Sequence, residues 1–371
     1  MGLQYQLALV TLVNRVDLVS RRLHNQKLSA PDCRKPVDVV RWFGAVQSQD
    51  FEAAKWALAL RMQRAANDDI EEAFNRGAIL RTHVMRPTWH FVAHDDIRWL
   101  LELTAPRVNL RSGPNYRKLE LDDAIFKRSR KVLENALKNG YHLPRSELRR
   151  RLNESGIAAN DTIRMAHILL RAELDGVVCS GPRLGKQFTY ALLEERVPAA
   201  KTIDRDEALA KLTRLYFKSH GPATLQDFAW WSGLNAADAK RGLQLVERSL
   251  EKATIEERVY WSFRSSQTPA DPSCTAYLLP AYDEYFVAYK DRSSVLDDQQ
   301  SLTTWDLLGP TVVINGIAAG RWKRTNDKKS IEIEFTRAVK KTERVAMAQA
   351  TTRYAEFLGL DPNQLSKNLF W

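Results

Sequence analysis

Helical patterning gives way to a short β-rich stretch three times along the chain, and this recurrence limits the fold more than any other feature. In the first copy, helical patterns at 12–23, 36–47 and from residue 48 onward precede the β-rich run "AILRTHVMRPTWHFVAHDD", in which Pro87 forces a bend. Three helices followed by a hairpin is the element order of a winged-helix motif. We therefore predict a first winged-helix module over residues 1–115.

The same order returns twice. The second copy has a short helix opening at Pro144, a long helix from about Asp161, and strands at 177–179 and 188–191 joined by "SGPRLGKQ". The third copy starts at Asp206, contains the capped helix "TLQDFAWWSGL", which ends at a glycine, and closes on the strand "ERVYWSF". These patterns predict winged-helix modules over 116–200 and 201–268.

The composition changes after the polar segment "SSQTPADPS". The dipeptide Asn315-Gly316 between apolar runs is a strong hairpin signal, and alternation at Ile331, Ile333 and Phe335 predicts a half-buried strand. We expect residues 269–371 to form a β-rich, barrel-like domain with a terminal helix. The predicted fold class is α+β, mainly α, with three tandem winged-helix motifs and this C-terminal domain.

Two glutamines flank a serine in "VQSQD", between two of the predicted helices. Ser48 is a suitable N-cap, and Asp50 would then lie in the first turn, where the helix dipole favours an acid. Residues two positions apart face the same way in an extended segment, but diverge on a continuous helix. Gln47 and Gln49 are therefore expected to point toward one site across a helix joint.

The charge balance makes polyanions candidate partners. The chain has 56 Lys and Arg against 45 Asp and Glu, a net charge of +11. Residues 107–151 contain thirteen basic and five acidic side chains, so the charge is clustered. A second basic excess lies between Arg321 and Arg344. The alternative interpretation is an ordinary solvated surface.

Several classes of protein find no support. No apolar run approaches the roughly 20 residues of a membrane span, and the N-terminus lacks a cleavage site, which predicts a cytoplasmic protein without membrane contact. The three cysteines form no Cys-x-x-Cys pair, and "GPRLGK" departs from a phosphate loop in its spacing. The local histidines His83, His90 and His94 lack paired carboxylates nearby, and no Gly-x-Ser-x-Gly elbow occurs. We expect no metal and no cofactor.

Five motifs in register resemble the AlkZ-like family of winged-helix DNA glycosylases. They are "GAVQSQD", "RTHVMRPTWHFV", "YFKSHGPATLQDFAWWSGL", "YLLPAYDEYFVAYKDRS" and "INGIAAGRW", and the resemblance covers roughly residues 10–365. It implies tandem winged-helix motifs with a C-terminal β-barrel, forming a concave body that binds double-stranded DNA. It also implies removal of N7-alkylated guanine by monofunctional base excision, including the unhooking of interstrand crosslinks.

The family's catalytic Gln-x-Gln falls on Gln47 and Gln49, and a related branch has Gln-x-Asp instead. The second glutamine here favours the crosslink-resistance type. Asp50 is a reserve candidate for the base that activates water, although an acid in a first turn is more often a complement to the helix dipole. Without the resemblance, the glutamine pair would be interpreted as a polar helix junction.

The chemistry agrees with a pair of carboxamides. N7-alkylated guanine carries a positive charge and leaves as a neutral molecule, so its departure requires no general acid. The protein has to orient a water molecule beside a sugar cation with oxocarbenium character. Carboxamides can do this but do not take up a proton near neutral pH. The reasoning predicts activity on cationic bases and none on normal ones.

Further residues are candidates for contact with DNA. Arg81, His83, Arg86 and His90 lie on the predicted hairpin beside the glutamines, where each either contacts the DNA or serves a structural role. Asp283, Tyr285 and Arg292 belong to the aromatic motif after residue 276, which lines the DNA channel or joins two domains. The competing functions are a non-catalytic winged-helix DNA-binding protein or transcriptional regulator, and a scaffold for a repair complex. Nothing in the sequence argues for more than a monomer.

Overall fold

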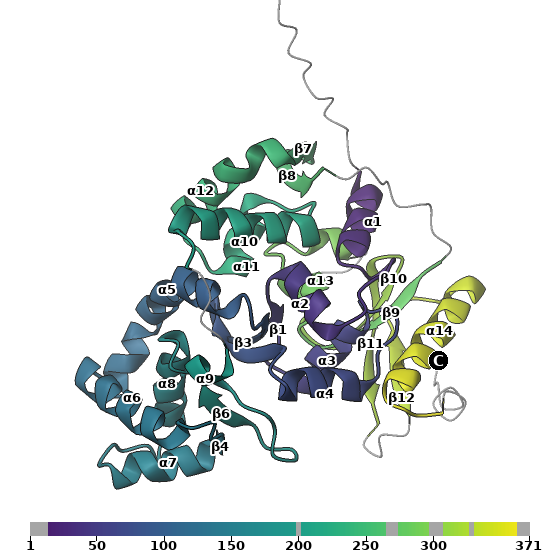
Figure 1. Ribbon diagram of the computed structural model, residues 1–371. Helices are drawn as coiled ribbons and strands as arrows, with labels where there is room; N and C mark the ends of the chain where they lie inside the picture. Colours follow the sequence, from purple (N-terminus) through teal and green to yellow (C-terminus); the bar gives the residue numbers. More distant parts are fainter. Residues whose placement is uncertain (1–13, 198–201, 265–273, 297–306, 326–329, 362–371) are drawn as a thin grey trace, which may run out of the picture.

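The computed structural model describes residues 14–197, 202–264, 274–296, 307–325 and 330–361, in which helices outweigh strands (Figure 1). The α+β class, with helix predominating, is confirmed. The segment 265–273, predicted to be a linker, lies outside the described residues.

The first region surrounds a three-stranded antiparallel sheet of order β1-β3-β2. Its helix α1 buries Leu18, Val19 and Leu23, whereas Val16 is 76% exposed. Pro36 is the first residue of α2, as predicted, and Gly44 ends that helix with φ +84°. The elements are α1 (Arg15–Asn25), α2 (Pro36–Phe43), β1 (Val46–Gln47), α3 (Phe51–Ala59), α4 (Asn67–Asn75), β2 (Ile79–Val84) and β3 (Arg86–Ala93).

The second region begins with α5 (Ile97–Lys118), a 22-residue helix that contains Pro106 and Pro114. The predicted helices at Pro144 and Asp161 and the strands around "SGPRLGKQ" are confirmed to within a few residues. The strand order is β4-β6-β5. The elements are α6 (Asp123–Leu137), β4 (Leu143–Pro144), α7 (Arg145–Glu154), α8 (Thr162–Leu174), β5 (Val178–Ser180), β6 (Thr189–Leu192) and α9 (Leu193–Arg196).

The third region also places helices before a hairpin. Thr224 caps α11 through the amide of Asp227, and Gly233 ends the helix in the left-handed region, as the sequence predicted. The elements are α10 (Arg205–Ser219), α11 (Leu225–Ser232), α12 (Ala236–Val246), the 3-10 helix η1 (Glu247–Ser249), β7 (Leu250–Ile255) and β8 (Arg258–Phe263). The number of winged-helix motifs and the division into four domains stay predictions.

The C-terminal strands form an antiparallel sheet of order β12-β11-β10-β9, and among the described residues this sheet does not close into a barrel. Asn315 and Gly316 both have positive φ in the tight turn between β10 and β11, as expected. The elements are β9 (Ala276–Leu279), α13 (Glu284–Val287), the 3-10 helix η2 (Ser293–Val295), β10 (Thr311–Ile314), β11 (Ile317–Arg324), β12 (Ile331–Phe335) and α14 (Lys341–Phe357).

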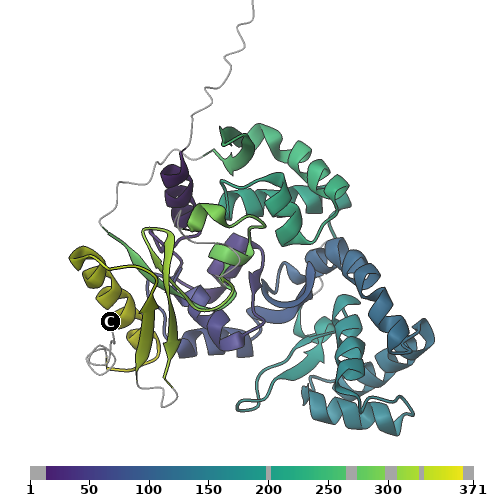
Figure 2. The same ribbon diagram turned by 180° about the vertical axis from the view of Figure 1, so that it is seen from behind.

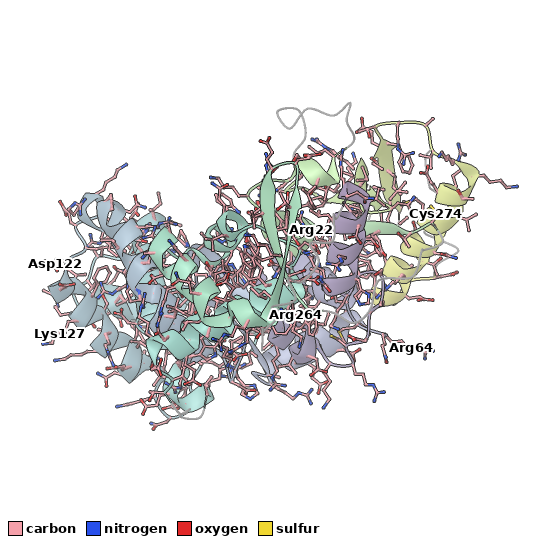
Figure 3. The ribbon with its side chains drawn as sticks, turned by 90° about the horizontal axis from the view of Figure 1, so that it is seen from above. Arg22, Arg64, Asp122, Lys127, Arg264 and Cys274 are labelled. Carbon is pink, nitrogen blue, oxygen red and sulfur yellow. The ribbon has the colours of Figure 1, made fainter. Side chains whose placement is uncertain are left out.

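The first region occupies the centre of the molecule. The second region and the C-terminal sheet lie on opposite sides of it, and α10–α12 lie along a third side (Figures 1 and 2). Seen from above, Asp122 and Lys127 mark one end of the protein and Cys274 the other, with Arg22 between them (Figure 3). One hydrophobic core joins α2–α4 to β9–β12 and α14, and a second joins β2 and β3 to α10–α12. The first region, with its central sheet, therefore packs against the C-terminal sheet and against α10–α12 through these two cores.

Candidate active site

The segment "VQSQD" forms the short edge strand β1 and then leads directly into α3. Val46 and Gln47 pair with Phe91 and His90 of β3, and the amide of Ser48 donates to the carbonyl of Trp89. Asp50 is the N-cap of α3, because its carboxylate accepts the amide of Ala53 at 3.1 Å. The prediction that Ser48 caps this helix is therefore wrong. The chain stays paired with β3 through residue 48, so the helix begins two residues later than expected.

Both glutamines contact β3 through their carboxamide oxygens. Gln47 is 8% exposed and its Oε1 accepts a hydrogen bond from Arg86 Nη2 at 3.1 Å. Gln49 is exposed, and its Oε1 accepts the amide of Trp89 at 3.4 Å. Neither carboxamide nitrogen has a hydrogen-bond partner among the described residues, and each oxygen keeps a second lone pair. The pair can therefore both donate to and accept from a further molecule.

Arg81 fixes the backbone between the two glutamines. Its Nε donates to the carbonyl of Ser48 at 3.0 Å and its Nη2 to that of Gln49 at 3.2 Å. The guanidinium also lies 4.2 Å from the centre of the Trp89 ring. Burial lowers the pKa of Arg81 to about 10, which leaves it charged at neutral pH. Its position is that of a structural clamp, the alternative that the sequence left open.

A buried carboxylate that sequence reasoning missed lies behind Gln47. Glu284 is 1% exposed, and it accepts the amide of Gln47 at 2.7 Å, Trp231 Nε1 at 3.0 Å and His220 Nε2 at 3.3 Å. Burial acts to raise the pKa of Glu284, but the hydrogen bonds from His220 and Gln47 outweigh it and lower the pKa below the usual carboxyl value. The site therefore holds a fixed negative charge. Glu284 lies in the sequence motif "AYDEY", which could have drawn attention to it. The candidate named from that motif was the preceding residue, Asp283.

His90 lies opposite Gln47 in the strand register and is fully buried. Its Nδ1 contacts the carbonyl of Thr88 at 2.9 Å. Burial, reinforced by the charge of Arg86, lowers the pKa of His90 to about 3, so the ring is neutral and its Nε2 is an acceptor. Its burial rules out contact with DNA in this conformation.

Unpartnered polar atoms gather on the strand positions around His90. Four buried atoms at these positions have no hydrogen-bond partner among the described residues: Thr82 Oγ1, Arg86 Nε, Thr88 Oγ1 and His90 Nε2. Arg86, Thr88 and His90 alternate along β3 and so face the same side, and Thr82 pairs with His90 in register. Buried polar atoms usually find partners in protein or water. This side of the sheet is therefore suited to hold water beside Gln47.

His83 points to a different partner. Its Nδ1 forms a short contact with Glu173 of α8, and its ring lies 4.5 Å from that of Trp89. His94 contacts Asp95 instead. Within the described part of the chain, no group of three or more metal-ligating side chains is brought together.

Asp283 and Tyr285 do not line a DNA channel. Asp283 forms a bidentate ion pair with Arg61, at 2.7 and 2.9 Å, and both side chains are buried. The hydroxyl of Tyr285 donates to the carbonyl of Gly316 at 2.8 Å inside the core. Arg292 is half-buried, with its Nε donating to the carbonyl of Phe286, and burial lowers its pKa. Asp283 therefore links the C-terminal part of the chain to the first region, while Tyr285 belongs to the core, in line with the structural alternative that the sequence left open.

The basic segment 107–151 is partly neutralised. Arg130 pairs with Glu134, and Arg150 pairs with both Glu147 and Glu154. Lys127 and Lys131 are exposed on α6 and make no ion pair among the described residues. The structure describes no helix with the length and apolar character of a membrane span.

The chain is similar to known DNA repair proteins. A family model described as "DNA glycosylase AlkZ-like" matches residues 40–357. An interstrand DNA cross-link repair glycosylase from Streptomyces sahachiroi is 24% identical over 333 residues, 81% of this chain and 85% of that protein. The solved structure of Streptomyces sahachiroi DNA glycosylase AlkZ has a TM-score of 0.80 at 20% identity, covering 94% of this chain and 98% of that one.

Proposed function

The chain belongs to the AlkZ-like family of DNA glycosylases, and from this premise we propose that it hydrolyses the N-glycosidic bond of cationic N7-alkylated purines in double-stranded DNA. The name of its Streptomyces sahachiroi relative, an interstrand cross-link repair glycosylase, extends the proposed substrates to crosslinks. The observation that carries the proposal is the placement of Gln47 and Gln49. Both carboxamides keep free hydrogen-bonding capacity, and the backbone of Gln47 contacts a buried carboxylate.

Each residue has a distinct role in the proposed reaction. Gln47 and Gln49 orient a water molecule against the anomeric carbon, and the alkylated base leaves as a neutral molecule. Glu284, behind Gln47, supplies the negative potential that stabilises a developing sugar cation. Neither carboxamide removes a proton, so the water oxygen bonds to the anomeric carbon as the bond to the base breaks, and the protonated hydroxyl that results releases its extra proton to solvent. Asp50 already accepts the amide of Ala53, which supports its role as a helix cap over that of a base.

This arrangement favours an activated leaving group. A normal purine leaves as an anion unless an acid protonates it, and neither glutamine can act as that acid. The carboxyl group of Glu284 is buried behind the backbone of Gln47 and is held ionised, so it has no proton to give. The positively charged N7-alkylpurine requires no such acid. Selectivity for cationic bases thus follows from the chemistry of the side chains.

Release of 7-methylguanine from methylated duplex DNA tests the proposal directly. We expect the wild type to release the base and the double variant Gln47→Ala, Gln49→Ala to release it at least about 100-fold more slowly, as for loss of oriented polar groups in other sites. Gln63→Ala, a change at an exposed glutamine outside the site, serves as the matched control. A wild type that binds DNA but releases no base would favour the non-catalytic DNA-binding protein. Full activity in the double variant would remove the two glutamines from the reaction.

A further inference from the structure

A pocket of about 310 Å³ lies between the central sheet and the second region. Its walls come from β2, β3, α5, α7, α8 and β6, and among the described residues that line it none is acidic. Its volume falls at the lower end of the range for small-molecule sites. The residues that determine its character are His83, Trp89, Arg111, Arg145, His167 and Tyr190.

Several polar groups on these walls have unused hydrogen-bonding capacity. Arg145 donates through Nη2 to the carbonyl of Thr162 at 2.6 Å, but its buried Nε has no partner. His167 contacts the carbonyl of Ile163 through Nδ1 at 2.9 Å, which leaves Nε2 as an acceptor in the neutral ring. Arg111 makes no hydrogen bond or ion pair with any residue that the structure describes. The pocket therefore presents donors and an acceptor for a ligand.

The remaining walls are flat and aromatic or aliphatic. The rings of His83 and Trp89 are 4.5 Å apart, and Tyr190 comes from β6. Burial raises the pKa of the Tyr190 hydroxyl, so it stays protonated and available as a donor. Aromatic faces beside arginines bind planar aromatic groups through stacking and cation–π contacts, and the arginines also attract phosphate. A planar aromatic group attached to DNA fits both properties.

Trp89 connects this pocket to the glutamine pair. Its side chain lines the pocket, and its backbone amide donates to Gln49 Oε1 at 3.4 Å. Trp89 alternates with Thr88 and His90 along β3, so its side chain and the pocket lie on the opposite face of this strand from His90, and the pocket and the glutamine pair share the backbone of β3. We propose that the pocket binds a planar aromatic group of the DNA that has left the base stack, either an extrahelical nucleobase or the aromatic part of a bulky adduct. This inference rests on the proposed action on damaged DNA.

A substitution that fills the pocket tests this inference. Ala166 is half-buried on α8 and lines the pocket, so Ala166→Phe fills the space without removing any polar group. Ile163→Phe is the matched control, because Ile163 is on the same helix but 60% exposed and outside the pocket. Fluorescence anisotropy of the full chain would measure affinity for three duplexes: intact, with one bulged nucleotide, and with an aromatic N7-guanine adduct. Binding is measured before any base release, so a catalytically inactive protein still gives a result.

We expect the wild type to prefer at least one of the two modified duplexes over the intact one, and Ala166→Phe to reduce that preference by about tenfold. Loss of preference for the bulged nucleotide identifies a nucleobase as the ligand, and loss for the adduct alone identifies the adduct. A wild type without any preference, or an Ala166→Phe variant with the wild-type preference, would overturn the inference. Tyr190→Leu, which removes an aromatic wall, is the second test if Ala166→Phe lowers the melting temperature more than Ile163→Phe does.

Discussion

The backbone amide of Gln47 donates a 2.7 Å hydrogen bond to the buried carboxylate of Glu284, which lies 237 positions further along the chain. Glu284 begins α13 in the C-terminal part of the protein, while Gln47 belongs to the edge strand of the central sheet. The hydrogen bond therefore holds the backbone of Gln47 against a charged carboxylate. It links the local structure of the "VQSQD" segment to the electrostatics of the proposed reaction.

Glu284→Gln keeps the size of this side chain and removes its charge. We expect the rate of 7-methylguanine release under single turnover to fall about tenfold, equivalent to about 1.4 kcal/mol of barrier, with DNA affinity unchanged. Glu343→Gln is a suitable control, because that carboxylate is also buried but pairs with Arg337 away from the site. Equal rates for the two variants would exclude an electrostatic role for Glu284.

His90 makes the stability of the protein sensitive to acid. Burial, reinforced by the charge of Arg86, lowers its pKa from 6.5 to about 3. Between these values the unfolded chain binds a proton that the folded chain does not, so the free energy of unfolding falls as the pH falls, by up to about 1.4 kcal/mol per pH unit. Urea unfolding at pH 7, 6 and 5 should show a shallower decline for His90→Gln than for the wild type. Parallel declines would contradict this assignment.

The ion pair between Asp283 and Arg61 is expected to serve stability and not DNA binding. Both side chains are buried, and Asp283→Asn leaves the charge of Arg61 uncompensated, at a cost of about 3–5 kcal/mol in the free energy of unfolding. Asp32→Asn removes an ion pair with Lys27 in which Asp32 is 62% exposed, and should cost less than about 1 kcal/mol. Denaturant unfolding measures both. A stable Asp283→Asn variant with weakened DNA affinity would restore the residue to the DNA-binding surface.

Lys127 and Lys131 on α6 are expected to bind phosphates of the DNA backbone. Their joint replacement by Gln should weaken DNA binding equally for intact and damaged duplexes. It should also make the slope of log K against log salt shallower by about 1 for each phosphate that the protein no longer neutralises. Lys341→Gln on the distant α14 is the control (Figure 1). Titrations at several salt concentrations measure the slope, and an unchanged slope would place the DNA elsewhere.

Much of the local structure was predictable because it depends on neighbours in sequence. Helix starts at Pro36 and Asp161, the glycine that ends α11 and the Asn315-Gly316 turn depend on side chains within a few residues of the backbone they fix. The cap of α3 was mispredicted because Ser48 and Asp50 are both suitable caps by composition. Pairing with β3 extends the strand past Ser48 and leaves Asp50 as the first residue free to cap.

In the candidate site, too, some features depend on local sequence and others on tertiary packing. The sequence by itself determined the glutamine pair, its position before a helix, and the family to which the chain belongs. Only the tertiary structure decided that Glu284, and not its neighbour Asp283, faces Gln47, while Asp283 turns to Arg61. Two adjacent carboxylates are equivalent in composition. Which one holds Arg61 and which one contacts the site depends on packing between segments more than 200 residues apart, and no local pattern encodes that packing.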